Sequence, residues 1–189
     1  MVNWGLILGV LGLAGCAGLE SAPAVSPLAQ PLLTSFQIAG RISVRHGNEG
    51  FSGNLTWRHA NAEDEFVILT PLGQGVARII KNAAGVTLER PEQGLVRAPD
   101  AESLTQSTLG FALPLSGLPH WVQAQPIGSN AQFRYNPDGT LDQLGEQGWQ
   151  IDYLTYRAVG ALQLPGKVFM ENADVKLRLI VDEWQAPAP

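Results

Sequence analysis

The residue types that most often carry out catalysis or bind metals are sparse in this chain of 189 residues. Its three histidines, His46, His59 and His120, are far apart, and none has a second histidine four positions away, the spacing of a helical metal-binding pair. We interpret them as surface residues. The sequence therefore predicts no metal site.

Other candidate catalytic patterns are equally weak. Glu63, Asp64 and Glu65 are consecutive, which is more typical of a solvated hairpin tip than of an acid–base pair. A G-x-S-x-G nucleophile motif and a G-x-x-x-x-G-K-[ST] phosphate loop are both absent from the sequence. Gly73-Gln-Gly75 resembles the start of a dinucleotide loop, but the third glycine is missing. We predict no catalytic residue, no cofactor and no enzymatic activity.

Composition points to a single domain with many short strands. The 12 Lys and Arg residues against 17 Asp and Glu residues give a net charge of −5, which argues against a nucleic-acid partner. The 21 glycines and 13 prolines favour turns over long helices. A single cysteine, Cys16, excludes an internal disulfide framework.

The N-terminus has the pattern of an export signal. An apolar run over residues 5–13 is too short to span a bilayer as a helix, and we assign residues 1–15 to a signal peptide. Leu13-Ala14-Gly15-Cys16 is similar to a bacterial lipobox, which implies a diacylglyceryl group on Cys16. Because Ala17 rather than Asp follows Cys16, the resemblance implies delivery to the outer membrane. The alternative is an ordinary signal peptide with a chance cysteine.

We divide the mature chain into a tether, a domain and a tail. Residues 16–35 carry three prolines among small and polar residues and show no helix or strand period, so we predict a flexible tether. Residues 36–185 form the predicted domain, and residues 186–189 the C-terminal tail.

Alternation of apolar and polar residues predicts about eleven antiparallel strands. We expect a first hairpin over residues 36–58 with a turn at His46–Gly50, and further strands at 66–70, 75–81, 86–90, 94–97, 132–135, 141–146, 149–155, 167–171 and 175–184. Such a sheet curls, as the sheets of barrels and sandwiches do, and the predicted fold is mainly β.

Two short helices interrupt the strand pattern. Asp100 can cap a helix that ends at Leu109, with Gly110 as its C-terminal cap, and a second helix is predicted over residues 115–123. The pair is either a lid over the mouth of the sheet or a plug that completes its core.

Large apolar side chains on one sheet face and on the helices are either a filled core or the wall of a cavity for an apolar ligand. The candidate cavity residues are Ile38, Ile42, Phe51, Leu55, Trp57, Phe66, Leu104, Leu118, Trp121, Trp149, Ile151, Tyr153 and Met170. A separate apolar residue, Leu72, stands between Pro71 and Gly73 in a turn, where Asn, Asp or Ser is usual. Such a tip could touch a bilayer or acyl chains.

These motifs, in this order, resemble the LolB family of outer-membrane lipoprotein receptors. The resemblance covers residues 36–184 and is carried by the lipobox and by Gly40-Arg41, Phe51-Ser-Gly53, Trp57, Thr70-Pro-Leu-Gly73, Leu109-Gly110, Leu113-Pro-Leu115, Leu118-x-x-Trp121, Gly148-Trp149-x-Ile-x-Tyr153, Leu164-Pro165 and Lys176-Leu-x-Leu-x-x-x-x-Trp184. Ala124 stands where the family commonly has glycine.

The resemblance implies an incomplete barrel with a helical lid of the kind found in LolA and LolB. Its cavity would accept the acyl chains of lipoproteins from the periplasmic carrier LolA, and the turn with Leu72 would act in membrane insertion. We expect a monomer, lipid-anchored on the periplasmic face of the outer membrane of a Gram-negative bacterium. Two alternatives remain: a structural lipoprotein adaptor or assembly pilot with a filled core, and, more weakly, a lipid hydrolase.

Overall fold

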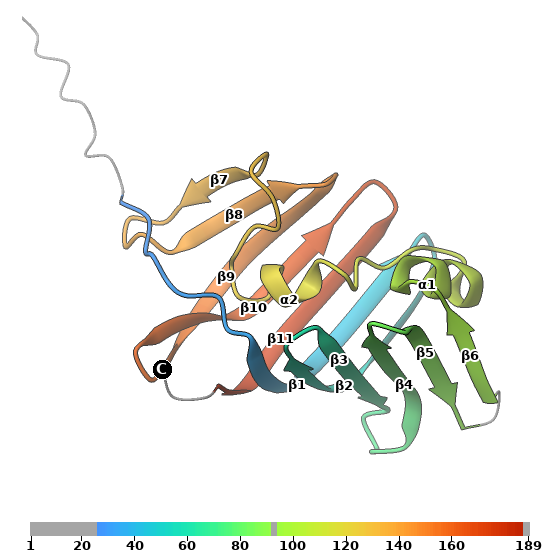
Figure 1. Ribbon diagram of the computed structural model, residues 1–189. Helices are drawn as coiled ribbons and strands as arrows, with labels where there is room; N and C mark the ends of the chain where they lie inside the picture. The colour runs from blue at the N-terminus through green and yellow to red at the C-terminus, as the bar shows by residue number, and fades with distance from the viewer. Residues whose placement is uncertain (1–25, 92–93, 187–189) are drawn as a thin grey trace, which may run out of the picture.

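The computed structural model describes residues 26–91 and 94–186. The predicted signal peptide and Cys16 lie outside the described residues, as do positions 187–189 of the predicted tail. The described chain forms eleven strands and two helices (Figure 1). The strands are β1 (Ser35–His46), β2 (Glu49–Ala60), β3 (Glu63–Leu69), β4 (Gly75–Asn82), β5 (Gly85–Arg90), β6 (Gly94–Ala98), β7 (Gln132–Tyr135), β8 (Leu141–Glu146), β9 (Trp149–Val159), β10 (Leu162–Glu171) and β11 (Val175–Gln185).

All eleven strands belong to one sheet in the order β6-β5-β4-β3-β2-β1-β11-β10-β9-β8-β7. The first and last strands are therefore neighbours at its centre, and β6 and β7 are its edges. The segment between β6 and β7 carries α1 (Ala101–Leu109) and α2 (Leu118–Trp121) and crosses the concave face of the curved sheet (Figure 1). The predicted class, a mainly β, incomplete antiparallel barrel with a short helical segment, is confirmed.

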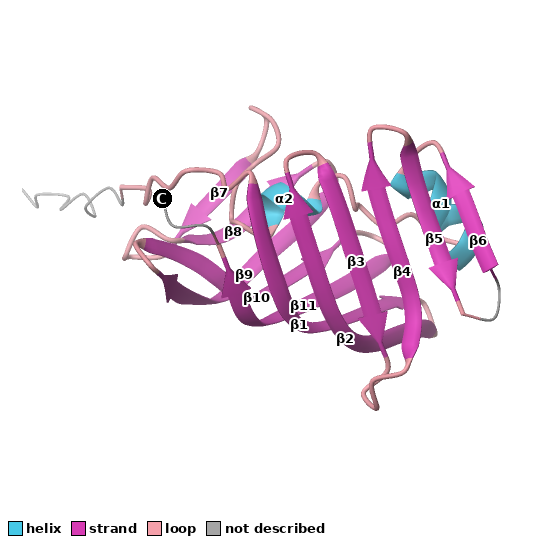
Figure 2. Cartoon of the chain, turned by 60° about the horizontal axis from the view of Figure 1, so that its bottom comes forward, coloured by secondary structure: helices cyan, strands magenta, loops and turns pink. Residues whose placement is uncertain are grey.

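The register of the strands defines two ends of the sheet. Because His46 pairs with Val175, the β1–β2 and β10–β11 turns lie at the same end, and alternation places the β3–β4 turn there too. We call it the Leu72 end. The β7–β8 and β9–β10 turns lie at the opposite end, which we call the Gly139 end. Figure 2 shows the β3–β4 turn protruding from the sheet.

Hydrophobic alternation explains the central strands. Every second residue of β11 from Val175 to Val181 is buried, and β1 buries Ile38, Ile42 and Val44 on the same face. A period of two puts successive side chains on opposite faces, so these residues form a continuous apolar concave surface.

Several element boundaries differ from the prediction. The β1–β2 turn is only residues 47–48, because both strands continue through residues that lack alternation. Strands β9 and β10 are longer than the predicted strands 149–155 and 167–171 and form a hairpin that turns at residues 160–161, since a register shift after Pro165 absorbs the proline within β10. The second helix is shorter, four residues, and the turn after it holds Ala124 at φ +56°.

Candidate functional site

An apolar cavity of about 480 Å³ lies between the concave face of the sheet and the α1 segment. This volume is within the ~300–1,000 Å³ typical of ligand pockets. Its lining comes from β1 to β5, β11, both helices and the loop that joins them. The residues are Ile42, Phe51, Leu55, Trp57, Phe66, Ile68, Gly75, Val76, Ala77, Ile79, Leu88, Arg90, Pro91, Leu104, Thr105, Thr108, Leu109, Leu113, Leu115, Leu118, Leu177 and Leu179.

The thirteen candidate cavity residues separate into two groups. Seven line the cavity: Ile42, Phe51, Leu55, Trp57, Phe66, Leu104 and Leu118. The other six are buried but do not line it, and they are Ile38, Trp121, Trp149, Ile151, Tyr153 and Met170. Apart from Ile38 and Trp121, this second group lies on β9 and β10. The cavity therefore lies mainly over β1 to β5, whereas these six side chains belong to the buried core outside it.

The α2 segment behaves as a plug of the C-terminal half. Trp121 is 1% exposed, and its indole Nε1 donates a hydrogen bond of 2.9 Å to Glu146 Oε2. The hydroxyl of Tyr153 donates to the carbonyl oxygen of Trp121 at 2.8 Å. These contacts fix the plug from both β8 and β9.

The α1 helix instead covers the cavity. It packs against the edge strand β6 and its neighbour β5, and Leu104, Thr108 and Leu109 on it line the cavity. Its start is fixed by Asp100, whose carboxylate accepts from the Ser103 backbone N–H at 2.7 Å, a cap that lowers the pKa of Asp100. The sequence left open whether the two helices form a lid over the sheet or a plug in its core. In the structure α1 covers the cavity as a lid, and α2 is packed into the core as a plug.

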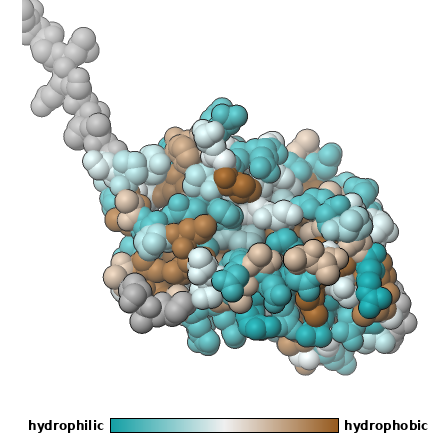
Figure 3. All heavy atoms as spheres, viewed as in Figure 1, coloured by the Kyte–Doolittle hydropathy of each residue, from teal (hydrophilic) through white to brown (hydrophobic). Residues whose placement is uncertain are grey.

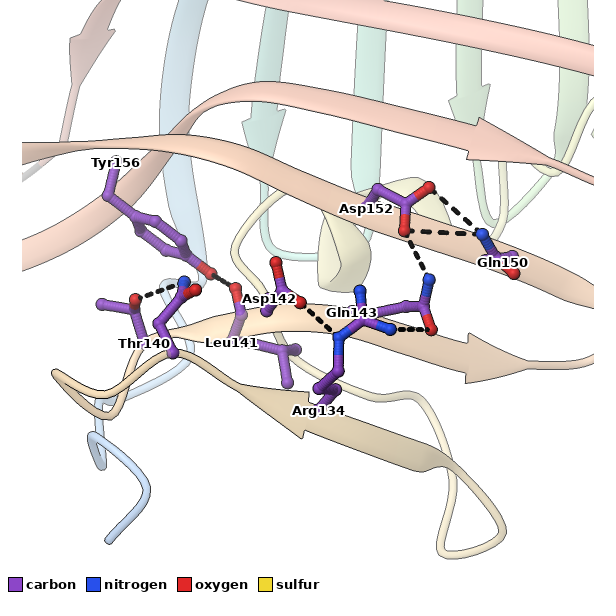
Figure 4. A network of polar contacts seen from close by, with 9 residues as sticks. Arg134, Thr140, Leu141, Asp142, Gln143, Gln150, Asp152 and Tyr156 are labelled. Atoms are coloured by element: carbon purple, nitrogen blue, oxygen red, sulfur yellow. Dashed lines mark hydrogen bonds and ion pairs between the residues drawn. The ribbon is translucent and has the colours of Figure 1, made fainter. Parts of the chain in front are cut away.

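Glu146 is a buried carboxylate that anchors the plug. Burial opposes its ionisation, but hydrogen bonds from the Ile127 N–H, the Trp121 indole and the Gly128 N–H outweigh this, so the pKa of Glu146 lies below its ordinary value. Neighbouring strands are joined by further polar contacts on β7, β8 and β9, where Gln143 donates to Asp152 at 2.6 Å and Arg134 pairs with Asp142 (Figure 4).

The acidic run at residues 63–65 is not a solvated hairpin tip, and that interpretation was wrong. Asp64 is 1% exposed because β3 begins at Glu63 and alternation turns Asp64 inward. Its carboxylate accepts hydrogen bonds from Trp57 Nε1 at 3.0 Å and Lys81 Nζ at 2.8 Å. Glu65 faces outward and pairs with two arginines of β2 and β4.

His59 is also buried, so its interpretation as a surface residue was wrong. Its Nδ1 lies 2.7 Å from Asp64 Oδ1, and its ring stacks on Phe36 at a centroid distance of 4.9 Å. His46 and His120 are half-buried. Within residues 26–91 and 94–186, no group of three or more His, Cys, Asp or Glu residues is placed to hold a metal ion.

The turn that carries Leu72 is held by its own backbone. The Gly73 N–H donates to the Thr70 carbonyl oxygen at 2.9 Å, and the Thr70 N–H donates to Gln74 at 2.8 Å. Gly73 has φ +84°, a left-handed conformation that glycine adopts without strain. The side chain of Leu72 is 90% exposed on this rigid turn.

The cavity reaches the same end of the sheet. Gly75 and Val76, which directly follow the turn, line it, as do Arg90 and Pro91 at the neighbouring end of β5. On the face viewed in Figure 3, apolar residues form separate patches among hydrophilic ones. The apolar cavity thus extends to the end of the sheet from which the exposed Leu72 projects.

The fold of the described chain, a curved antiparallel sheet crossed by a helical segment, is shared with a solved protein. A solved LolA superfamily protein from Nitrosomonas europaea is similar with a TM-score of 0.52 at 12% sequence identity, covering 83% of this chain and 88% of that chain. Among the described residues, no helix is long and apolar enough to cross a membrane.

Sequence comparison is more specific. The family model described as "Outer membrane lipoprotein LolB" matches residues 34–184. An outer-membrane lipoprotein LolB from Thiobacillus denitrificans is 38% identical over 175 residues, 92% of each chain, and one from Azoarcus sp. is 37% identical over 79% of this chain and 78% of its own. The chain belongs to the LolB family. The predicted family is confirmed, and the location named for these relatives agrees with the predicted outer-membrane location.

Proposed function

We propose that this chain is an outer-membrane lipoprotein receptor. It accepts acylated lipoproteins from the periplasmic carrier LolA and inserts them into the outer membrane, to which it is anchored through Cys16. Membership of the LolB family supports this role. The observation that carries it is the apolar cavity of about 480 Å³, which reaches the same end of the sheet as the exposed Leu72.

The cavity supplies an environment in which acyl chains avoid water. Its walls are almost entirely aliphatic and aromatic side chains. Each CH₂ group removed from water contributes about 0.8 kcal/mol, so a chain of many CH₂ groups needs such a wall throughout its passage. A filled adaptor core would lack this space, which argues against that alternative.

Leu72 supplies the contact with the bilayer. Burying a leucine side chain in hydrocarbon contributes about 1.5–3 kcal/mol, enough for a transient contact and too little for a permanent one. Pro71 and Gly73 hold this tip beyond the ends of the strands. A transient insertion beside the rim of the cavity gives acyl chains a short path into the membrane.

Transfer in this scheme requires neither catalysis nor a nucleotide, metal or cofactor. It proceeds downhill when the receptor binds acyl chains more tightly than the carrier does, and the bilayer binds them more tightly still. We propose a monomer without a nucleic-acid partner, in keeping with the net charge of −5.

Two-stage transfer tests this function. Carrier loaded with an acylated lipoprotein is mixed first with a soluble Cys16→Ala form and then with vesicles. Cargo should move from carrier to this form, and a non-acylated version of the same lipoprotein should not. Failure of the soluble form to take up acylated cargo would contradict a self-contained cavity.

A further inference from the structure

Residues 26–34 lie against the domain, although the sequence predicts them to be part of a flexible tether. We call this segment the strap. The Leu28 N–H donates to the carbonyl oxygen of Gly139 in the β7–β8 turn at 2.8 Å. The side chain of Gln30 bonds to both backbone groups of Gln163 in β10, accepting from its N–H at 2.5 Å and donating to its carbonyl oxygen at 2.9 Å.

A second set of contacts holds the end of the strap nearest β1. The Leu33 N–H donates to Gln123 Oε1 at 2.7 Å, and Gln123 Nε2 donates back to the Leu33 carbonyl oxygen at 3.2 Å. Gln123 is 2% exposed and follows the α2 plug. The strap therefore bonds to three segments that are about 90 to 133 residues away in the sequence.

The strap leaves the domain at the end opposite to Leu72. Its partners Gly139 and Gln163 lie in or beside the β7–β8 and β9–β10 turns, which form the Gly139 end. Figure 4 shows the blue N-terminal segment passing beside the turn that carries Thr140. The described chain thus begins at one end of the sheet, and the Leu72 turn projects from the other.

The length of chain before the strap limits how far the domain can turn relative to its membrane anchor. β1 and β11 have 12 and 11 residues and run from one end of the sheet to the other, which corresponds to about 36–40 Å. The ten residues from Cys16 to residue 25 span at most ~33–36 Å when fully extended, and a flexible chain of that length has an r.m.s. span of ~16–19 Å.

Release of the strap removes this limit. Residues 16–34 are nineteen residues, with a maximum span of ~63–68 Å and an r.m.s. span of ~22–26 Å when flexible. For Gaussian chains, the probability of spanning one strand length then rises by about an order of magnitude. The domain can now turn its Leu72 end into the bilayer that holds its anchor.

We propose that the strap is an orientation device. When docked, it keeps the Leu72 end and the rim of the cavity away from the anchoring membrane, facing the compartment from which cargo arrives. When released, it lets the Leu72 turn enter the membrane. The proposal rests on the proposed function, because it assumes an anchor at Cys16 and an insertion role for Leu72.

One substitution should release the strap by steric means. Gly139 has φ +84°, and a Cβ added there would lie 2.5 Å from the Ser26 carbonyl oxygen and 3.2 Å from the Leu28 nitrogen. Gly160, in the β9–β10 turn at the same end, has φ +60° with nothing within 4 Å of an added Cβ. Gly139→Ala and Gly160→Ala therefore share the backbone strain, but only the first displaces the strap.

Two further variants test the effect of strap release without introducing backbone strain. Gln30→Ala removes both hydrogen bonds to Gln163. Insertion of nine Gly and Ser residues directly before Ser26 lengthens the free chain from ten to nineteen residues and leaves the strap docked. Both should mimic strap release.

The experiment uses the full lipidated chain in vesicles of phosphatidylethanolamine and phosphatidylglycerol. A Gln74→Cys substitution carries an environment-sensitive fluorophore, since the side chain of Gln74 is exposed beside Leu72 and Cys16 is acylated. We expect the rate of fluorophore entry into the bilayer to rise severalfold, up to about tenfold, in Gly139→Ala, in Gln30→Ala and in the insertion variant. Gly160→Ala should match the unaltered chain.

Combining Gly139→Ala with the insertion should give little further increase in the rate of fluorophore entry, because the docked strap no longer restricts the reach of the chain once it is released. The proposal is overturned if the insertion and both release variants leave the rate unchanged. Uptake of acylated cargo from the carrier is measured on the same samples. Failed uptake by the unaltered chain would contradict the proposed function, whereas normal uptake with unaltered rates contradicts the strap alone.

Discussion

The indole Nε1 of Trp57 donates a hydrogen bond of 3.0 Å to the buried carboxylate of Asp64. Trp57 forms part of the cavity wall, with its ring stacked on Phe66 at a centroid distance of 4.8 Å. Because Asp64 takes up the one polar group of the indole, the tryptophan contributes apolar surface to the cavity without an unpaired N–H. The hydrogen bond to Asp64 thus allows Trp57 to present only apolar surface to a hydrocarbon ligand.

Asp64→Asn should destabilise the fold strongly. It removes the charge that faces Lys81 Nζ at 2.8 Å and leaves that ammonium without its buried partner. Breaking a fully buried ion pair typically costs about 3–5 kcal/mol, and because the Lys81 side chain is 23% exposed we expect a smaller cost here, which urea unfolding should report as a lower free energy of unfolding. The adjacent, exposed Glu63→Gln should change it by less than about 0.5 kcal/mol. Equal stabilities would show that the buried pair contributes nothing.

Glu146 should make stability depend on pH in the acid range. The lowered pKa of Glu146 in the folded chain means that its carboxylate stabilises the fold above its unfolded pKa of ~4.3, and that this stability is lost as the pH falls through the lower folded value. Urea unfolding as a function of pH should show a shallower acid decline for Glu146→Gln. The exposed Glu49→Gln should keep the decline of the unaltered chain, and an unchanged slope in Glu146→Gln would refute the assignment.

Leu72→Glu should separate cargo uptake from membrane delivery. The side chain is 90% exposed, so folding and transfer from the carrier should change little. Loss of about 1.5–3 kcal/mol of membrane contact should slow delivery into vesicles by at least about tenfold. Leu154→Glu is the matched control, because Leu154 is an exposed leucine on β9 away from the turn. Normal delivery by Leu72→Glu would exclude an insertion role.

Thr108→Trp should block the cavity. Thr108 lines it from α1, and an indole brings ~150–250 Å² of side-chain surface into the empty space. Displacement of a fluorescent fatty acid should show at least tenfold weaker binding, whereas the free energy of unfolding should stay within about 1 kcal/mol. Ser107→Trp places the same bulk on the exposed side of α1 and should bind normally. If Thr108→Trp also binds normally, acyl chains occupy another part of the molecule.

Local patterns predicted much of this structure. Alternation along β1 and β11, the cap at Asp100 and the turn around Gly73 each depend on residues close in the sequence, and the structure has all three. The sequence did not predict that β10 begins before Pro165 and pairs with β9 as a hairpin. A register shift that accommodates a proline within a strand has no sequence signal of its own.

The sequence by itself determined the strands, their apolar face and the exposed leucine tip. Only the tertiary structure decided what covers that face, because a period of two identifies the side of a strand and not the element packed on it. The crossing segment fills the C-terminal half around Trp121 and leaves space beside Trp57. Burial of Asp64 and docking of the strap on Gly139 likewise depend on pairings between distant segments, which composition and spacing do not encode.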